Sequence, residues 1–500
     1  MAETVSPAPQ PWLGQSGLIV ASLVLCLLRL LVAAKSGLTD DEAYYRLWGL
    51  SPAWSYLDHP PMAGWLIWLG QALAGDNALG VRLSAVLAPL LGTLLTWRTA
   101  NLLFGEPVAE WACWFGLAMP LMAAGGVIMT PDTPSVLCWG LTGWAVAELR
   151  ASGRSNWWLP IGLFAGLGLL SKYTNLFAGA GIVLWLLASG EFLRWVRTWQ
   201  FWAGGVVAVL LTLPVLFWNE THHWASFSKQ FGRVGAGEGL TLRFLAELLG
   251  GMFGLLSPAI AVLAMIGLWR ATTLAFKDRK SSHLLLLCSV APVGLYLLVH
   301  SLHDRVQANW PAPIYPALGL LAAIGLTTTR WLSEAAAVRV AWLGRLALPL
   351  GFAMSALIYL HVMAPLVNLA GERDPTSQMR GWVDFSRSLE AKRQSIGAQW
   401  VATSNYATTG QLAIRSPVPV LQLTERLRYV NLPAVQPSIL GTPALYVELQ
   451  RRQEPDLLRR KFRVVTDEGT LSRMSGGIEI AKYALFRVAE PVAPVLDPIE

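Results

Sequence analysis

The sequence predicts an α-helical polytopic membrane protein with a small soluble α/β domain at its C-terminal end. Of its 500 residues, 54% are hydrophobic and only 14% are charged, whereas the charged share expected of a soluble domain is about 25%. Apolar windows of near-membrane length recur along the chain. The 24 Trp residues fit side chains that anchor many spans at the two membrane interfaces.

About eleven membrane-spanning helices are expected from these windows. They lie near 16–34, 79–97, 108–127, 134–149, 157–171, 174–190, 202–218, 249–269, 283–300, 312–329 and 346–366. The N-terminal MAETVSPAPQPWLGQ has no basic region, so the first window is interpreted as a retained span and not as a cleaved signal. The four cysteines all fall in apolar runs and are expected to be small buried hydrophobes. They are Cys26, Cys113, Cys138 and Cys288.

Lys and Arg fall on alternate connections between the expected spans, which assigns those connections to the cytoplasmic side. The connections contain Arg98; Arg150 and Arg154; Arg194 and Arg197; Arg270, Lys277, Arg279 and Lys280; and Arg330, Arg339 and Arg345. These loops explain the formal net charge of +7. Nucleic-acid binding is not expected, because no basic face alternates with aromatic residues on a soluble module.

The composition changes after about residue 370, where charged stretches alternate with short apolar runs of strand length. The runs are QWVATS, PVPVLQL, PALYVEL, KFRVVTD and YALFRVA. Two domains are therefore predicted, a transmembrane domain at 1–370 and a soluble α/β domain at 371–500. With eleven spans and a cytoplasmic N-terminus the second domain lies outside, and an error of one span would place it inside. The final EPVAPVLDPIE is expected to be a loose tail.

Three consecutive acids, Asp40, Asp41 and Glu42, follow the first span and precede AYYRLWGL, on the side opposite the basic loops. Acids this close to a bilayer are costly unless they face water or perform a function. A carboxylate at the outer mouth of a cavity can take a proton from an incoming hydroxyl or amine. The structural alternative is a helix N-cap, in which an Asp satisfies free backbone amides.

Further polar residues fall on the same side. They are His59 before Pro60, Asp132 in MTPDTP, Lys172 and Tyr173 in SKYTN, and Arg305 and Asn309 in HDRVQANWPAP. Arg binds phosphate oxygens in a fixed fork geometry. Each residue also has a structural interpretation as a turn residue, a snorkelling cation or part of an interfacial cluster. His222 and His223, in the long loop 219–247, do not define a metal site without a third ligand.

The segment DEAYYRLWGLSPAWSYLDHPPMAGWLI resembles the first outer loop of the polyprenyl-phosphate-sugar-dependent glycosyltransferases with the GT-C fold. The branch is that of the protein O-mannosyltransferases and the lipid A aminoarabinose transferases. MTPDTP, GLGLLSKYT and VQANWPAPIYPAL match it in order and spacing, and VATSNYATTGQLAI does so more weakly. The resemblance covers most of 35–320 and extends loosely over the remainder.

The resemblance implies a membrane glycosyltransferase that takes a sugar from a polyprenyl phosphate, undecaprenyl phosphate in a bacterium. The acceptor would be an envelope lipid, glycan or protein on the outer face of the inner membrane. It implies that Asp41 is the base for an inverting displacement and that Glu42 is its partner, while Asp40 is a helix cap or an additional charge.

The same resemblance assigns substrate contacts to His59, Asp132, Lys172 and Arg305. Tyr173 and Asn309, from the same two segments as Lys172 and Arg305, are predicted to bind substrate as well. Some relatives bind a divalent metal near the acids, and the sequence defines no ligand set for one. A transporter or flippase of a lipid-linked sugar is the alternative function, although neither repeated halves nor broken spans near the midplane are evident.

Overall fold

The computed structural model describes residues 14–232, 239–367 and 374–499. It divides into two units. The first contains the described parts of 1–31, 58–63 and 84–359, and the second contains 32–57, 64–83 and the described parts of 360–500. The predicted boundary between 370 and 371 lies outside the described residues, as do the N-terminal segment 1–13 and part of the 219–247 loop.

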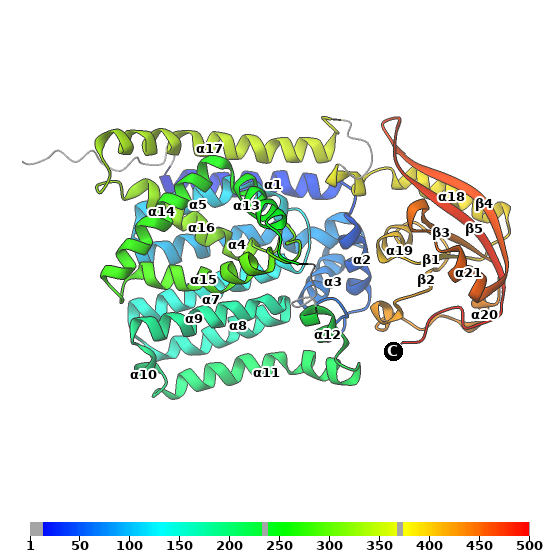
Figure 1. Cartoon of the computed structure of the whole chain (residues 1–500), viewed down its shortest axis with the longest axis horizontal. Helices are drawn as coiled ribbons and strands as arrows, with labels where there is room; N and C mark the ends of the chain where they lie inside the picture. Colours follow the sequence, from blue (N-terminus) through cyan, green and yellow to red (C-terminus); the bar gives the residue numbers. More distant parts are fainter. Residues whose placement is uncertain (1–13, 233–238, 368–373, 500) are drawn as a thin grey trace, which may run out of the picture. The chain divides into compact units, whose positions relative to one another are not determined.

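The first unit is built of helices, and its long helices run alongside one another (Figure 1). They are α1 (Gly14–Lys35), α4 (Ala78–Phe104), α5 (Glu106–Ala118), α6 (Pro120–Gly125), α7 (Asp132–Ser152), α8 (Trp158–Ser171), α9 (Leu176–Ser189), α10 (Phe192–Trp195), α11 (Trp199–Thr221), α12 (Ala225–Phe231), α13 (Arg243–Leu256), α14 (Pro258–Lys277), α15 (Ser282–His300), α16 (Tyr315–Thr327) and α17 (Glu334–Met363). Helices α1, α4 and α17 continue into the second unit.

Six helices within the described residues are long and apolar enough to cross a membrane: α1, α4, α11, α14, α15 and α17. The predicted polytopic membrane fold is thus confirmed, whereas the number eleven stays a prediction. Shorter apolar helices also occur, among them α3 (Met62–Ala74). The sequence-based assignment missed α3, because its 13 residues fall well short of the roughly 20 that a span needs.

Two expected spans are interrupted. The window 108–127 is divided between α5 and α6, because Pro120 has no amide hydrogen to continue the first helix. The prediction of one continuous helix over 249–269 was wrong. Helix α13 ends before Ser257, and helix α14 begins at Pro258. Ser257 has a positive φ of 73°, a backbone conformation that a continuous helix does not contain.

Close helix packing in the first unit depends on small residues. A Cβ atom on Gly162 of α8 would lie 1.9 Å from the carbonyl oxygen of Gly204 on α11, so the two backbones touch at this crossing. Small residues at helix crossings are typical of membrane bundles, where van der Waals contact replaces the hydrophobic effect. The four cysteines are buried and unpaired, which confirms their interpretation as small hydrophobes.

Basic residues near the helix ends of the first unit contact neighbouring segments. Arg98 forms an ion pair with Glu148 at 2.8 Å, and Arg150 donates a hydrogen bond to the carbonyl oxygen of Lys280. Lys280 in turn lies 3.8 Å from a carboxylate oxygen of Glu191. These contacts support the predicted grouping of these loops at one end of the helices.

The second unit contains a five-stranded sheet in the order β2-β1-β3-β5-β4 (Figure 1). Its strands are β1 (Trp400–Thr403), β2 (Val420–Gln422), β3 (Ala444–Leu449), β4 (Phe462–Ser475) and β5 (Ile478–Pro491). Strand β1 pairs in parallel with β2 and β3, and β5 pairs antiparallel with β3 and β4. Its helices include α2 (Asp40–Leu50), α18 (Trp382–Ser395), α19 (Tyr406–Ala413), α20 (Pro437–Leu440) and α21 (Pro455–Lys461).

Side chains from both faces of this sheet are buried. Trp400 and Ala402 belong to one apolar cluster and Val401 to another, as the alternation of side chains along a strand requires. The five predicted runs all fall on strands, although β4 and β5 extend beyond them as a long hairpin. The predicted loose tail was wrong, because Val495 is buried and Asp497 pairs with Lys461 at 2.7 Å.

Candidate active site

The acidic triplet forms the first turn of α2. Thr39 is the N-cap, and its hydroxyl accepts a hydrogen bond from the amide of Glu42 at 3.2 Å. The Glu42 carboxylate accepts one from the amide of Thr39 at 2.9 Å, which completes a capping box. The interpretation of Asp40 as the helix cap was therefore wrong. A Thr followed three residues later by Glu is the sequence signal that identifies the real cap.

Glu42 is fully buried and pairs with the equally buried Arg82 of α4. The guanidinium donates to both carboxylate oxygens, at 2.7 Å and 2.6 Å. Arg82 also donates to the carbonyl oxygens of Ser36 and Gly37, at the turn between α1 and α2. Because this bidentate pair joins three chain segments, Glu42 fixes where α2 begins.

Asp41 is exposed at the start of α2. Its Oδ1 accepts a hydrogen bond of 3.0 Å from the hydroxyl of Tyr406, the first residue of α19. The Arg428 guanidinium lies over the Tyr406 ring, 4.8 Å from its centroid. A solvent-exposed carboxylate held in one orientation by a neighbouring hydroxyl is suited to accept a proton from a bound acceptor.

Helices α19 and α2 approach each other at Gly410. A Cβ atom at this position would lie 2.8 Å from backbone atoms of Ala43 and Tyr44, so only Gly permits this separation. The close contact brings Tyr406 at one end of α19 to Asp41. Gln411, near the other end, donates to Asp40 Oδ1 at 3.0 Å and to the Leu38 carbonyl oxygen at 3.0 Å.

Asp40 differs from Asp41 in its surroundings. Burial raises the pKa of Asp40 above its usual value, and the hydrogen bond from Gln411 opposes this effect in part. Since the folded-state pKa is the higher one, the native state holds the proton more tightly than the unfolded chain. The free energy of unfolding therefore falls as the pH rises from about 4, where Asp40 ionises in the unfolded chain, to the raised pKa of Asp40 in the folded state.

We expect Asp40→Asn to raise the melting temperature at pH 7 and to change it little at about pH 3, where wild-type Asp40 is mostly protonated in both states. Asn retains the oxygen that Gln411 contacts. Thermal unfolding in detergent between about pH 3 and pH 8 measures this. Asp456→Asn, at an exposed position of α21, is the matched control. If Asp40→Asn lowered the melting temperature equally at every pH, the loss of stability could not be attributed to the ionisation of Asp40.

Three of the predicted substrate contacts lie together in the first unit, and we call Asp132, Lys172 and Asn309 the Asp132 cluster. The Lys172 ammonium lies 2.6 Å from Asp132 Oδ1, and the Asn309 amide donates to Oδ2 at 2.5 Å. Asp132 begins α7, and Lys172 directly follows α8. The Asp132 and Lys172 side chains are 10% and 12% exposed, so the pair is accessible only at its edge.

The other predicted contacts have partners outside this cluster. Tyr173 shares a hydrogen bond of 2.9 Å with the buried Ser226 of α12. Arg305 is exposed and pairs with Glu247 at 2.8 Å. His59 is half-buried in a loop whose neighbouring residue Asp58 pairs with Lys229 at 3.0 Å.

Sequence reasoning missed Tyr406, Gln411 and Arg82, which contact the acidic triplet. The first two fall in VATSNYATTGQLAI, and only the weak family resemblance singled out this segment. Within residues 14–232, 239–367 and 374–499, no group of three or more His, Cys, Asp or Glu side chains is arranged to hold a metal ion. The residues described there do not fit a divalent metal.

Comparison with solved structures decides the fold. The structure of ArnT from Cupriavidus metallidurans bound to undecaprenyl phosphate superposes with a TM-score of 0.66, over 97% of this chain and 100% of that one, at 16% sequence identity. This chain has the GT-C fold. The archaeal oligosaccharyltransferase AglB from Archaeoglobus fulgidus, at a TM-score of 0.50 and 10% identity, covers 82% of this GT-C chain and 65% of its own length.

Sequence comparison finds similarity over parts of the chain. Residues 58–218 match the family described as dolichyl-phosphate-mannose-protein mannosyltransferase. A Pseudomonas aeruginosa undecaprenyl phosphate-alpha-4-amino-4-deoxy-L-arabinose arabinosyl transferase is 31% identical over 193 residues, which is 34% of this chain and 33% of that protein. A Pseudomonas fluorescens transferase of the same description is 26% identical over 290 residues, 50% and 51% of the two chains.

The matches to these curated relatives span between about a third and a half of their length. Within the GT-C chain, the family match contains His59, Asp132, Lys172 and Tyr173. The resemblance predicted from the sequence motifs is thereby confirmed.

Proposed function

We propose that this protein is an integral membrane glycosyltransferase that moves a sugar from a polyprenyl phosphate to an envelope acceptor. The observation that carries the proposal is the agreement in fold along nearly the whole chain with ArnT, a protein described as bound to undecaprenyl phosphate. The segmental sequence identity to undecaprenyl-phosphate aminoarabinose transferases supports undecaprenyl phosphate as the lipid carrier.

In the proposed reaction, Asp41 is the general base. One carboxylate oxygen takes the proton from the acceptor hydroxyl or amine, while Tyr406 fixes the orientation of the carboxylate. The acceptor atom forms a bond to the anomeric carbon as the bond from that carbon to the phosphate oxygen breaks. Attack opposite the leaving polyprenyl phosphate inverts the configuration. Glu42 acts as a positioning residue through its pair with Arg82.

The Asp132 cluster supplies the cation in this proposal. Lys172 is held by Asp132 at the end of α8, and its ammonium stabilises negative charge on the donor phosphate. Asn309 donates to the other oxygen of Asp132 and thereby fixes the carboxylate that orients Lys172. His59, Tyr173 and Arg305 are proposed as further donor or acceptor contacts.

Removing the charge of Lys172 is expected to lower the ratio kcat/KM for the donor by about ten- to a hundredfold, because a charged hydrogen bond contributes about 1.5–3 kcal/mol. The double variant Lys172→Gln with Asp132→Asn avoids leaving a nearly buried carboxylate unpaired. Steady-state transfer measures the effect, and Lys277→Gln, at the exposed last residue of α14, is the matched control. Unchanged kcat/KM in the double variant would exclude the proposed phosphate contact.

Transfer from a panel of polyprenyl-phosphate sugars to lipid, glycan and peptide acceptors tests the function. The protein in liposomes is assayed with and without EDTA, which determines whether a divalent cation takes part. Sugar transfer by the wild type supports the proposal. Movement of the donor across the bilayer with no transfer would instead establish the transporter alternative.

We propose that the Asp41 site and the C-terminal α/β domain face the periplasm. The distribution of Lys and Arg among the loops supports this orientation. A reporter that is active only in the periplasm, fused after Glu500, tests it. Activity is the expected result, and a reporter active only in the cytoplasm would reverse the orientation.

A further inference from the structure

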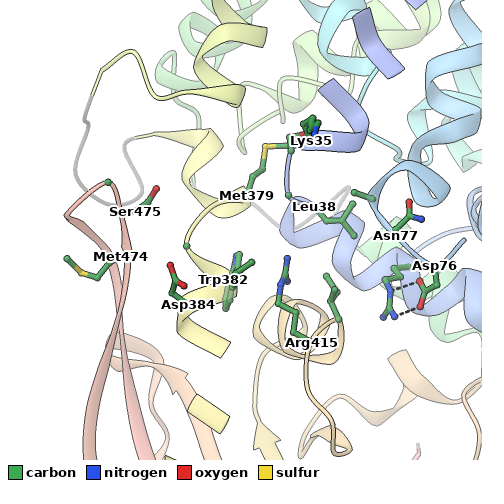
Figure 2. Close-up of a pocket in the computed structure, with 18 of the residues that line it drawn as sticks. Lys35, Leu38, Asp76, Asn77, Met379, Trp382, Asp384, Arg415, Met474 and Ser475 are labelled. Atoms are coloured by element: carbon green, nitrogen blue, oxygen red, sulfur yellow. Dashed lines mark hydrogen bonds and ion pairs between the residues drawn. The ribbon is translucent and has the colours of Figure 1, made fainter. Parts of the chain in front are cut away.

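The second unit contains a cavity of about 620 Å³. Its walls come from the end of α1 and the turn after it, the turn before α4, the start of α18, the end of α19 and the β4–β5 hairpin. Figure 2 shows Lys35, Leu38, Asp76 and Asn77 on one side and Trp382, Asp384, Met474 and Ser475 on the other. The volume lies within the range of roughly 300–1,000 Å³ typical of ligand sites.

The cavity has an excess of positive charge. Its two carboxylates are both neutralised by arginines: Asp76 pairs with Arg46, and Asp384 pairs with Arg387 at 2.9 Å. Two further cations, Lys35 and Arg415, line the cavity. Neither forms an ion pair with any residue that the structure describes.

Arg415 extends into this cavity from the end of α19 (Figure 2). Within the described ranges, its Nη1 is buried and has no hydrogen-bond acceptor. Burial and the nearby charge of Arg46 both lower the pKa of Arg415, which reflects the cost of a guanidinium at this place. An unpaired buried donor on a charged group is costly, and a bound anion would remove that cost.

The place of the cavity along the chain indicates which anion it meets. Lys35 is the last residue of α1 and Ala78 the first of α4, and both helices are candidate spans. The ends of spanning helices lie at the level of the lipid headgroups. Val383 and Met474, which also line the cavity, are 59% and 43% exposed, so its wall combines apolar side chains with cations.

We propose that this cavity binds the phosphate of a membrane lipid headgroup, with Arg415 and Lys35 contacting the phosphate oxygens. The apolar side chains Val383 and Met474 contact the first carbons of the lipid. The inference rests on the membrane location of the chain and not on glycosyl transfer. Neither Asp41 nor Tyr406 lines the cavity, so the proposed lipid site and the Asp41 site do not share these residues.

Isothermal titration of the full-length protein in detergent with dioctanoyl phosphatidate tests the proposal. Two probes separate the sources of phosphate: dioctanoylglycerol has the tails without the phosphate, and glycerol 3-phosphate has the phosphate without the tails. We expect phosphatidate to bind at least about tenfold more tightly than either, since both charged and apolar contacts are then made. Equal binding of dioctanoylglycerol, or equal binding of glycerol 3-phosphate, would overturn a lipid phosphate site.

Two variants assign the residues. Arg415→Gln and Lys35→Gln are each expected to weaken phosphatidate binding about tenfold. Arg459→Gln, which removes an exposed charge from α21 outside the cavity, is expected to leave the affinity unchanged. Unaltered affinity in both cavity variants would overturn the assignment.

The melting temperature without ligand separates binding from folding. Arg415→Gln is expected to melt at or above the wild-type temperature, because it removes a buried unpaired donor. Since Lys35 is exposed, Lys35→Gln tests binding even where Arg415→Gln fails to fold. Asp41→Asn is expected to bind phosphatidate like the wild type, which keeps this inference distinct from the proposed chemistry.

Discussion

Replacing Asp41 by Asn is expected to reduce sugar transfer by about 10²–10⁴-fold, the contribution typical of a general base. The amide has nearly the same shape as the carboxylate, and its oxygen still accepts the hydrogen bond from Tyr406. It cannot take a proton from the acceptor. The loss should therefore appear in kcat, with little change in KM for the donor or in the melting temperature.

The adjacent acid provides the control for this experiment. Asp40→Asn removes a charge one residue away, and Asp40 is held by Gln411 and not by Tyr406. It should retain transfer within a few-fold, because no proton passes through it. Full activity in Asp41→Asn, or an equal loss in Asp40→Asn, would contradict the assignment of Asp41 as the base.

Breaking the buried ion pair is expected to have the largest effect on stability. Glu42→Gln leaves the Arg82 guanidinium buried without a countercharge, which costs about 3–5 kcal/mol. The backbone amide of Thr39 and the turn before α2 depend on the same carboxylate. Chemical or thermal unfolding of the purified protein in detergent measures the loss, and transfer activity should fall with the folded fraction.

A double variant distinguishes the pair from its surroundings. Glu42→Leu with Arg82→Met replaces both charges by apolar groups and should recover much of the stability lost in either single variant. Asp384→Asn breaks an exposed pair with Arg387 and should change stability by less than about 1 kcal/mol. If Glu42→Gln cost no more than this exposed control, the structural role of Glu42 would be disproved.

Local patterns allowed much of the fold to be predicted. Apolar windows located the long helices, and short apolar runs located all five strands, because each signal is contained within one element. Breaks between helices were harder to predict from the sequence. Ser257, for example, interrupts an apolar run whose composition is that of a single span. The hairpin of β4 and β5 extends through polar residues, where backbone pairing and not burial maintains the strands.

The candidate site was predictable only in part. Asp41, Asp132 and Lys172 stand out as charges beside apolar runs. Their partners do not, because Tyr406 lies 365 positions from Asp41 and no periodicity links the two. Arg82 lies within the expected span 79–97, and no local pattern in the sequence links its charge to Glu42. Three-dimensional contact is required to separate the structural role of Glu42 from the exposed position of Asp41.

The contact of α19 with the first turn of α2 limits how chains of this fold can be recombined. Tyr406 and Gln411, both encoded near the end of the chain, hold two carboxylates encoded near its beginning. A chimaera that exchanges only the C-terminal domain between relatives would bring a foreign α19 against a native α2. A functional chimaera therefore requires α2 and α19 to be exchanged together. At this site the two segments, and not the C-terminal domain alone, must come from the same relative.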